Sequence, residues 1–78
     1  MPRRKPDEKT KFLILLGQNV REQRRKAKLT QEKLAGLAEL APRTIQKIEA
    51  GRLDILASTL RRLRAALGCR FDDLLNGD

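Results

Sequence analysis

The sequence predicts an all-α fold, a compact bundle of five short helices, and two observations lead to this prediction. Leu, Ala and Ile dominate the apolar residues, whereas Val occurs once and Trp and Tyr are absent. This composition favours packed helices over a sheet. Apolar residues also recur every three or four positions through most of the chain, which is the period of an amphipathic helix. A length of 78 residues is enough for one small domain.

The first eleven residues differ in composition from the rest of the chain. Residues 1–11 hold two prolines and many charges but show no apolar periodicity. We therefore expect a disordered basic arm there, followed by one folded domain over residues 12–76. Arg3, Arg4 and Lys5 give this arm the positive charge to contact phosphates or a groove of an anionic partner. The alternative is a solvated terminus without a role.

A first helix is expected from Phe12 to about Lys28, where apolar residues recur among Gln, Arg and Lys. Its expected core face consists of Phe12, Leu16, Val20 and Ala27. Gly17 inside this helix costs about 1 kcal/mol relative to Ala, which is tolerable if a neighbouring helix comes close there. The apolar run at 12–16 exceeds one core face. Its excess should pack on the C-terminal segment or, as the alternative, on a second subunit.

Two short helices joined by a tight corner follow. The first is expected from Gln31 to Ala38, with Thr30 as its side-chain N-cap. The second is expected from Pro42 to Ala50, because the proline ring pre-sets the helical φ angle at the first position. Four apolar residues at helical spacing are expected to close a core between the two helices: Leu34, Ala38, Ile45 and Ile48.

Two more helices are expected to complete the bundle. The fourth should run from Thr59 to Leu67, with Ser58 as its N-cap and Gly68 as its terminating residue. A short fifth helix should occupy residues 71–75, where two acidic residues suit the first turn. The apolar stripe of the fourth helix comprises Leu60, Leu63 and Leu67.

The second helix of the central pair places three polar side chains on one outward face. Arg43, Gln46 and Lys47 lie at positions i, i+3 and i+4. A guanidinium can form two hydrogen bonds to guanine O6 and N7, and a carboxamide can pair with adenine N6 and N7 in the same way. Lys47 suits a base edge or the adjacent phosphate. A short helix held by another and presenting such side chains meets the requirements for reading the major groove. The alternative is a polar helix face in solvent.

The charge balance indicates a polyanionic partner. Eighteen basic and ten acidic residues give a net charge of +8 and a pI of about 10.6. Nucleic acid is the first partner to consider, with an anionic membrane surface as the weaker rival. The longest apolar run has five residues, too short to span a membrane, and it lacks the features of a signal peptide. Since the single Cys69 excludes an internal disulfide, we expect a cytoplasmic protein.

The inventory of reactive side chains argues against an enzyme. Histidine is absent, which excludes zinc sites built on Cys and His and hydrolases that need a His base. There is no Gly-rich phosphate loop and no cluster of carboxylates suited to a cleft. No cofactor, metal or small-molecule effector is therefore indicated. We expect Cys69 to be a small core residue and not a redox sensor.

Several motifs taken together resemble the phage-repressor and Cro type (XRE-like) helix-turn-helix family. They are LTQEKLA at 29–35, TI at 44–45, IEAG at 48–51 and FDDLL at 71–75. The resemblance covers roughly Leu16 to Leu75. It implies a five-helix domain of the lambda-repressor-like type, which usually binds operator DNA as a symmetric dimer.

The resemblance also implies roles for individual residues. Residues 41–47 match the base-reading start of the recognition helix, and Gln31 matches a position that contacts phosphate and supports that helix. Ala35 matches a small residue where the two helices cross. Arg24 and Glu49 match a pair that often joins the first helix to the recognition helix, the alternative being two unrelated surface charges. The DNA-binding residues expected from the sequence are Gln31, Ala41, Pro42, Arg43, Thr44, Gln46, Lys47 and Arg52, with Gln31, Thr44 and Arg52 assigned to phosphates.

Three residues depart from the family pattern. Glu39 in the corner and Lys28 at the end of the first helix replace frequent glycines, so a left-handed backbone at either position would be mildly strained. Pro42 replaces a polar side chain; it can touch a thymine methyl group but cannot form a pair of hydrogen bonds. The operator preference therefore does not transfer from any relative.

These observations predict a transcriptional regulator that binds double-stranded DNA sequence-specifically and acts as a repressor. One domain of this size reads few base pairs, so we expect a homodimer. Its interface is expected around Leu53, Ile55 and Leu56 with Leu74 or Leu75; alternatively, these residues complete the core. Two other functions stay open: an antitoxin or restriction-modification controller of the same fold, and a protein-interaction module that has lost DNA binding.

Overall fold

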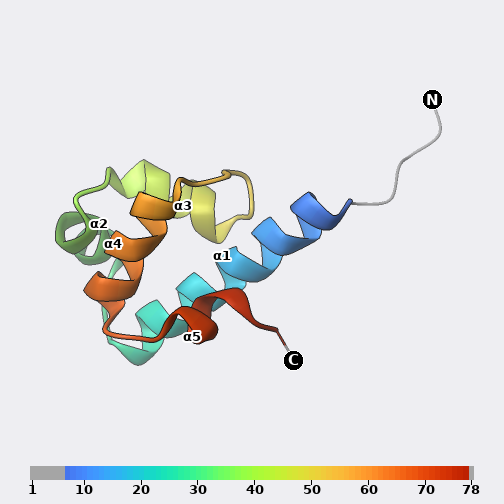
Figure 1. The fold of residues 1–78 in the computed structure, drawn as a ribbon. Helices are drawn as coiled ribbons and strands as arrows, with labels where there is room; N and C mark the ends of the chain where they lie inside the picture. The colour runs from blue at the N-terminus through green and yellow to red at the C-terminus, as the bar shows by residue number, and fades with distance from the viewer. Residues whose placement is uncertain (1–6, 78) are drawn as a thin grey trace.

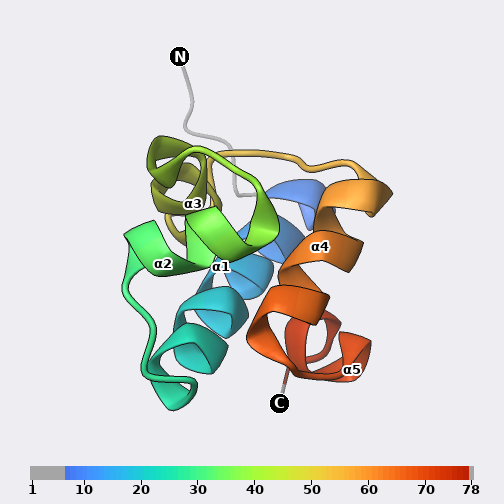
Figure 2. The same ribbon diagram turned by 90° about the vertical axis from the view of Figure 1, so that its left-hand side faces the viewer.

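Helices alone form the regular secondary structure of residues 7–77, the part of the chain that this computed structural model describes. In chain order they are α1 (Glu8–Lys26), α2 (Gln31–Ala38), α3 (Pro42–Glu49), α4 (Ala57–Leu67) and α5 (Phe71–Leu75) (Figure 1). α1 is the long central helix, and Figure 2 shows the four others arranged around it. α3, α4 and α5 pack on α1, while α2 packs on α3 and α4. The predicted five-helix fold is confirmed.

α1 begins earlier than the sequence predicts. It starts at Glu8 instead of Phe12, because the carboxylate of Asp7 accepts a hydrogen bond of 2.8 Å from the backbone N–H of Thr10 and caps the helix. The expectation that residues 7–11 belong to a disordered arm is therefore wrong. Residues 1–6, with Arg3, Arg4 and Lys5, lie outside the described residues.

The core lies where α1, α2, α3 and α4 meet. The four residues expected to close the central pair, Leu34, Ala38, Ile45 and Ile48, are all buried. On α1 the expected face is partly wrong. Leu13, Leu16 and Val20 are buried, whereas Phe12 is 41 % exposed and Ala27 is exposed. Residues 13, 16, 17 and 20 form one stripe at helical spacing, and Phe12 lies beside that stripe.

Gly17 lies where α1 and α3 come closest. A β-carbon at this position would be 2.8 Å from the carbonyl oxygen of Glu49 and still closer to that of Ile48. The missing side chain allows the end of α3 to rest directly on the backbone of α1. The expectation that a neighbouring helix approaches Gly17 is confirmed.

The C-terminal helices match the predictions except at the start of α4. α4 begins at Ala57, and Leu56 occupies the N-cap position without a side-chain hydrogen bond, so the assignment of Ser58 as the cap is wrong. Gly68 ends α4 in the left-handed conformation, with a φ of 65°, as expected. Leu74 is fully buried in the core, which removes it from the expected dimer interface. Cys69 is half-buried against the core.

The apolar run at 12–16 is shared between the core and the surface. Leu13 and Leu16 are buried, while Phe12 and Ile14 are 41 % and 42 % exposed. Leu15 is half-buried and lies against Gly77 near the C-terminus. The excess thus packs only partly on the C-terminal segment. Over residues 7–77, no helix has both the length and the apolar character that crossing a membrane requires.

Candidate nucleic-acid interface

α3 is held by its apolar side and leaves its polar side in solvent. Ile45 and Ile48 are buried completely or nearly so. Pro42 occupies the first position of the helix, and Ala41 precedes it as an N-cap that lacks a side-chain acceptor. The carbonyl oxygen of Ala41 accepts a hydrogen bond of 2.9 Å from the backbone N–H of Thr44 and closes the first turn.

The corner between α2 and α3 depends on Glu39. This residue ends α2 in the left-handed conformation with a φ of 57°, where the family often has Gly. The turn lets the backbone N–H of Leu40 donate a 2.8 Å hydrogen bond to the carbonyl oxygen of Ala35, which is itself buried at the helix crossing. Lys28, between α1 and α2, is left-handed as well, with a φ of 59°. Both residues adopt a conformation that costs a non-glycine residue about 1–2 kcal/mol.

The exposed side of α3 brings together most of the residues expected to bind DNA. Arg43, Gln46 and Lys47 are exposed, and together with Ala50 and Arg52 they line one shallow depression of the surface. The other expected residues lie around it without lining it. Ala41 and Pro42 are exposed at the start of α3, Thr44 is half-buried, and Gln31 is half-buried at the start of α2.

The opposite, buried side of the same helix carries a charged residue. The side chain of Glu49 is completely buried. Arg24 donates to it twice, from Nε to Oε2 at 2.6 Å and from Nη2 to Oε1 at 3.1 Å. Gln31 donates from Nε2 to Oε1 at 3.1 Å. The ion pair implied by the family resemblance is thus present, and the network joins α1, α2 and α3.

The network keeps Glu49 ionised. Burial is the largest single influence on the pKa of Glu49 and would raise it. The hydrogen bonds from Arg24 and Gln31, the charge of Arg24 and the hydrogen bond from Arg21 together outweigh burial and hold this pKa below its ordinary value of 4.5. The pKa of Arg24 is raised in turn, chiefly by its hydrogen bond to Glu49. The end of α3 is therefore tied to α1 by full charges at neutral pH.

Sequence reasoning missed Arg21 as a member of this network. Its Nε lies 3.4 Å from Oε1 of Glu49, so two guanidinium groups face one carboxylate. The signal was available, because Arg21 and Arg24 are three positions apart and so lie on one face of a helix. The family pattern marks only the second of the two.

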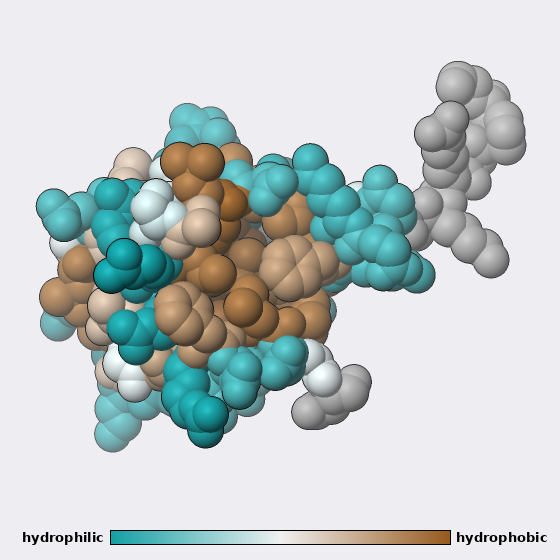
Figure 3. All heavy atoms as spheres, in the orientation of Figure 1, coloured by the Kyte–Doolittle hydropathy of each residue, from teal (hydrophilic) through white to brown (hydrophobic). Residues whose placement is uncertain are grey.

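A separate apolar surface lies over α1, α4 and α5. Figure 3 shows apolar side chains gathered between these helices. The exposed apolar residues of these helices and of the connection before α4 include Phe12, Leu56 and Phe71, and Leu56 is 73 % exposed. We call this surface the apolar face. Leu53, Ile55 and Leu75 are half-buried and pack against the core, so they belong to the core at least in part.

Comparisons with known proteins agree with this geometry. The helix-turn-helix family model HTH_3 matches residues 20–74. The solved structure of the restriction-modification controller protein C.AhdI from Aeromonas hydrophila is 31 % identical, with a TM-score of 0.76 over 80 % of this chain and 94 % of that one.

Two further solved structures are similar. The clp gene regulator ClgR from C. glutamicum is 26 % identical with a TM-score of 0.77, over 82 % of this chain and 83 % of that one. The hypothetical transcription factor NHTF from Neisseria is 25 % identical with a TM-score of 0.80, over 97 % of this chain and 87 % of that one. A search among curated proteins gave no match. The chain belongs to the XRE-like helix-turn-helix family of DNA-binding transcription regulators.

Proposed function

We propose that this protein is a repressor that reads an operator in double-stranded DNA by placing α3 in the major groove. The observation that carries the proposal is the two-sided character of α3. One side presents Arg43, Gln46 and Lys47 to solvent, and the other is fixed by Ile45, Ile48 and the Glu49 network. A helix that enters a groove must keep its angle to the body of the domain, and this arrangement supplies that rigidity.

The expected DNA-binding residues divide between base contacts and phosphate contacts in this proposal. Arg43 pairs with guanine O6 and N7, and Gln46 with adenine N6 and N7. Lys47 contacts a base edge or the adjacent phosphate, while Ala41 and Pro42 touch a thymine methyl group. Gln31, Thr44 and Arg52 contact phosphates and fix the register of the domain on the duplex. The net charge of +8 supports a nucleic-acid partner and argues against an interaction module that has lost DNA binding.

The proposed repressor is a homodimer in the cytoplasm, and DNA binding, not catalysis, is its activity. The apolar face offers a contact surface for the second copy, since exposed apolar residues such as Leu56 and Phe71 gain by leaving water. Leu53, Ile55 and Leu75 extend this surface at its half-buried margin. A symmetric dimer places two α3 helices about 34 Å apart, one turn of DNA, and so predicts a palindromic operator.

A second candidate function is control of a restriction-modification system. The similarity to a restriction-modification controller protein over 94 % of that chain favours it. The DNA-binding surface proposed above serves either role equally. Mapping the bound sites in the source genome distinguishes the two, because a controller should bind next to restriction-modification genes.

Selection of bound sites from random duplexes tests the proposal. We expect a palindromic motif with half-sites one turn apart and a stoichiometry of two chains per duplex. A pool that shows no enriched sequence after repeated selection would contradict base reading by α3.

A further inference from the structure

Arg21 has hydrogen-bonding capacity that the protein leaves unused. Its Nε donates to Glu49, and its side chain is 48 % exposed. Arg24 differs, because its side chain is only 14 % exposed and its Nε, Nη1 and Nη2 donate to Glu49 or to the carbonyl oxygen of Leu29. Within residues 7–77 the terminal nitrogens of Arg21 make no hydrogen bond to protein. Arg21 is thus oriented by the buried carboxylate while its outer edge faces solvent.

A second cation lies one helical turn from Arg21. Arg25, at i+4, is exposed, and both residues line a shallow hollow on α1 with Gln18, Glu22 and Lys26. Lys26 is paired with Glu22 at 3.7 Å, whereas Arg25 has no acidic partner among the described residues. The hollow therefore offers two guanidinium groups for a single anion, one held in place by Glu49 and one exposed without an acidic partner among the described residues.

This hollow adjoins the proposed DNA surface. Arg21 and Gln31 both donate to the same oxygen of Glu49, so their head groups are neighbours at the junction of α1, α2 and α3. The network also holds two guanidiniums against one carboxylate, which leaves one positive charge that an anion would neutralise. A guanidinium with free terminal nitrogens binds phosphate oxygens well.

We infer that Arg21 and Arg25 form a phosphodiester-binding site on α1, which extends the footprint of the domain along the DNA backbone beyond the surface made by α2 and α3. This inference rests on the proposed DNA binding. Glu49 then has two tasks, since it fixes α3 through Arg24 and aims Arg21 at a phosphate. Because the site touches backbone only, it adds affinity without base preference.

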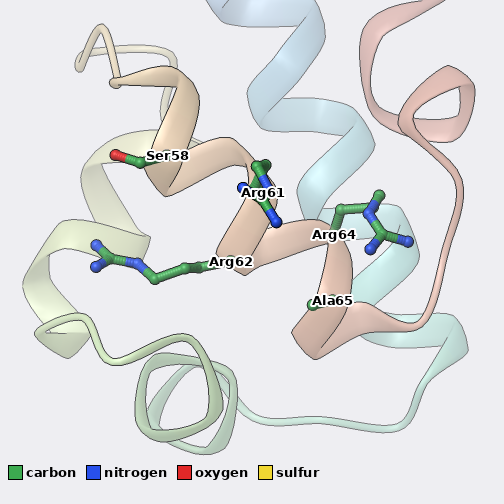
Figure 4. A pocket seen from close by; sticks show the side chains of 5 residues that line it. All are labelled: Ser58, Arg61, Arg62, Arg64 and Ala65. Atoms are coloured by element: carbon green, nitrogen blue, oxygen red, sulfur yellow. The ribbon is translucent and has the colours of Figure 1, made fainter.

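The test is the salt dependence of DNA binding by Arg21→Ala, Arg25→Ala and the double variant between 50 and 200 mM salt. A plot of log K against log salt has a negative slope, and each substitution should make this slope less steep by about 0.9. Each should also weaken binding about tenfold, equally on the selected operator and on random duplex. Arg61→Ala on α4 is the matched control, since it removes the same charge from an exposed residue (Figure 4). Its slope should match that of the unaltered protein.

Other variants separate the possible outcomes. Arg21→Lys keeps the charge and should retain most of the slope. An Arg21→Ala variant that melts at a lower temperature but keeps the full slope would show a purely structural role and overturn the inference. An equal change of slope in Arg61→Ala would overturn it too, because the effect would not be local. If the unaltered protein binds no DNA at all, the proposed function itself fails, which is a distinct result.

Discussion

The guanidinium of Arg24 and the buried carboxylate of Glu49 form a bidentate ion pair, with 2.6 Å between Nε and Oε2 and 3.1 Å between Nη2 and Oε1. The pair joins the last turn of α1 to the last residue of α3. A buried pair of this kind contributes little net stability compared with apolar residues of similar shape. It does fix one angle between the two helices, which is what a base-reading helix needs.

Removing Arg24 should be costly because it leaves a buried charge with fewer partners. We expect Arg24→Ala to lower the free energy of unfolding by about 3 kcal/mol, at the low end for a broken buried pair, since Arg21 and Gln31 remain. Urea denaturation measures this. Lys26→Ala breaks only the exposed pair with Glu22 and should cost no more than about 0.5 kcal/mol. Similar losses in the two variants would contradict the role assigned to Arg24.

The lowered pKa of Glu49 predicts how stability depends on pH. A carboxyl group whose pKa is lower in the folded state stabilises the fold above its ordinary value of 4.5, and that contribution is lost as the pH falls from 4.5 towards the folded pKa. The free energy of unfolding should therefore decrease in this window. Glu49→Gln should flatten the decrease, leaving the contribution of Asp7, whose pKa is lowered by the backbone N–H of Thr10. A Glu49→Gln profile parallel to that of the unaltered protein would contradict this.

Two glycines in helix interiors should respond oppositely to the same substitution. Gly17→Ala places a β-carbon against the carbonyl oxygens of Ile48 and Glu49, and we expect a loss of about 1–3 kcal/mol as α1 and α3 are forced apart. Gly36→Ala meets no atom within 4 Å and should add about 0.5–1 kcal/mol of helix propensity. Thermal denaturation of both variants is the measurement. A stabilised Gly17→Ala would show that the two helices are not in close contact.

The affinity for duplex DNA should fall steeply with salt. If about six phosphates are neutralised, binding should weaken about 10³-fold between 50 and 200 mM salt. The reason is that binding releases cations from the duplex, and this release is less favourable when the salt concentration is higher. Fluorescence anisotropy with a labelled duplex gives the slope. An affinity that hardly changes over this range would contradict binding to phosphates by this protein of net charge +8.

The central pair of helices was predictable from the sequence because its signals are local. The N-cap Thr30, the proline at 42 and the spacing of Leu34, Ile45 and Ile48 each act within one or two turns, and the structure has α2 and α3 where these signals place them. The start of α1 was missed because prolines and charges in the first residues outweighed a single capping carboxylate at Asp7.

Tertiary contacts explain what the sequence left undecided in the candidate site. Arg21 reaches Glu49 because the missing side chain of Gly17 lets α3 lie against α1. The spacing of Arg21 and Arg24 places both on one face of α1, but it does not tell which acidic residue that face meets. Leu74 looked available for a dimer interface, but it is covered completely once α5 packs on α1. The spacing of apolar residues in a short C-terminal helix thus does not tell whether they pack in the core or contact a partner, because tertiary packing decides this.

The most direct test of base reading by α3 is the affinity of Arg43→Ala for the selected operator and for its single-base-pair variants. We predict a loss of about 1–3 kcal/mol on the operator and a relaxed preference at one base pair, with little change on random duplex. An equal loss on the operator and on random DNA would contradict it, because Arg43 would then contact phosphate and no base.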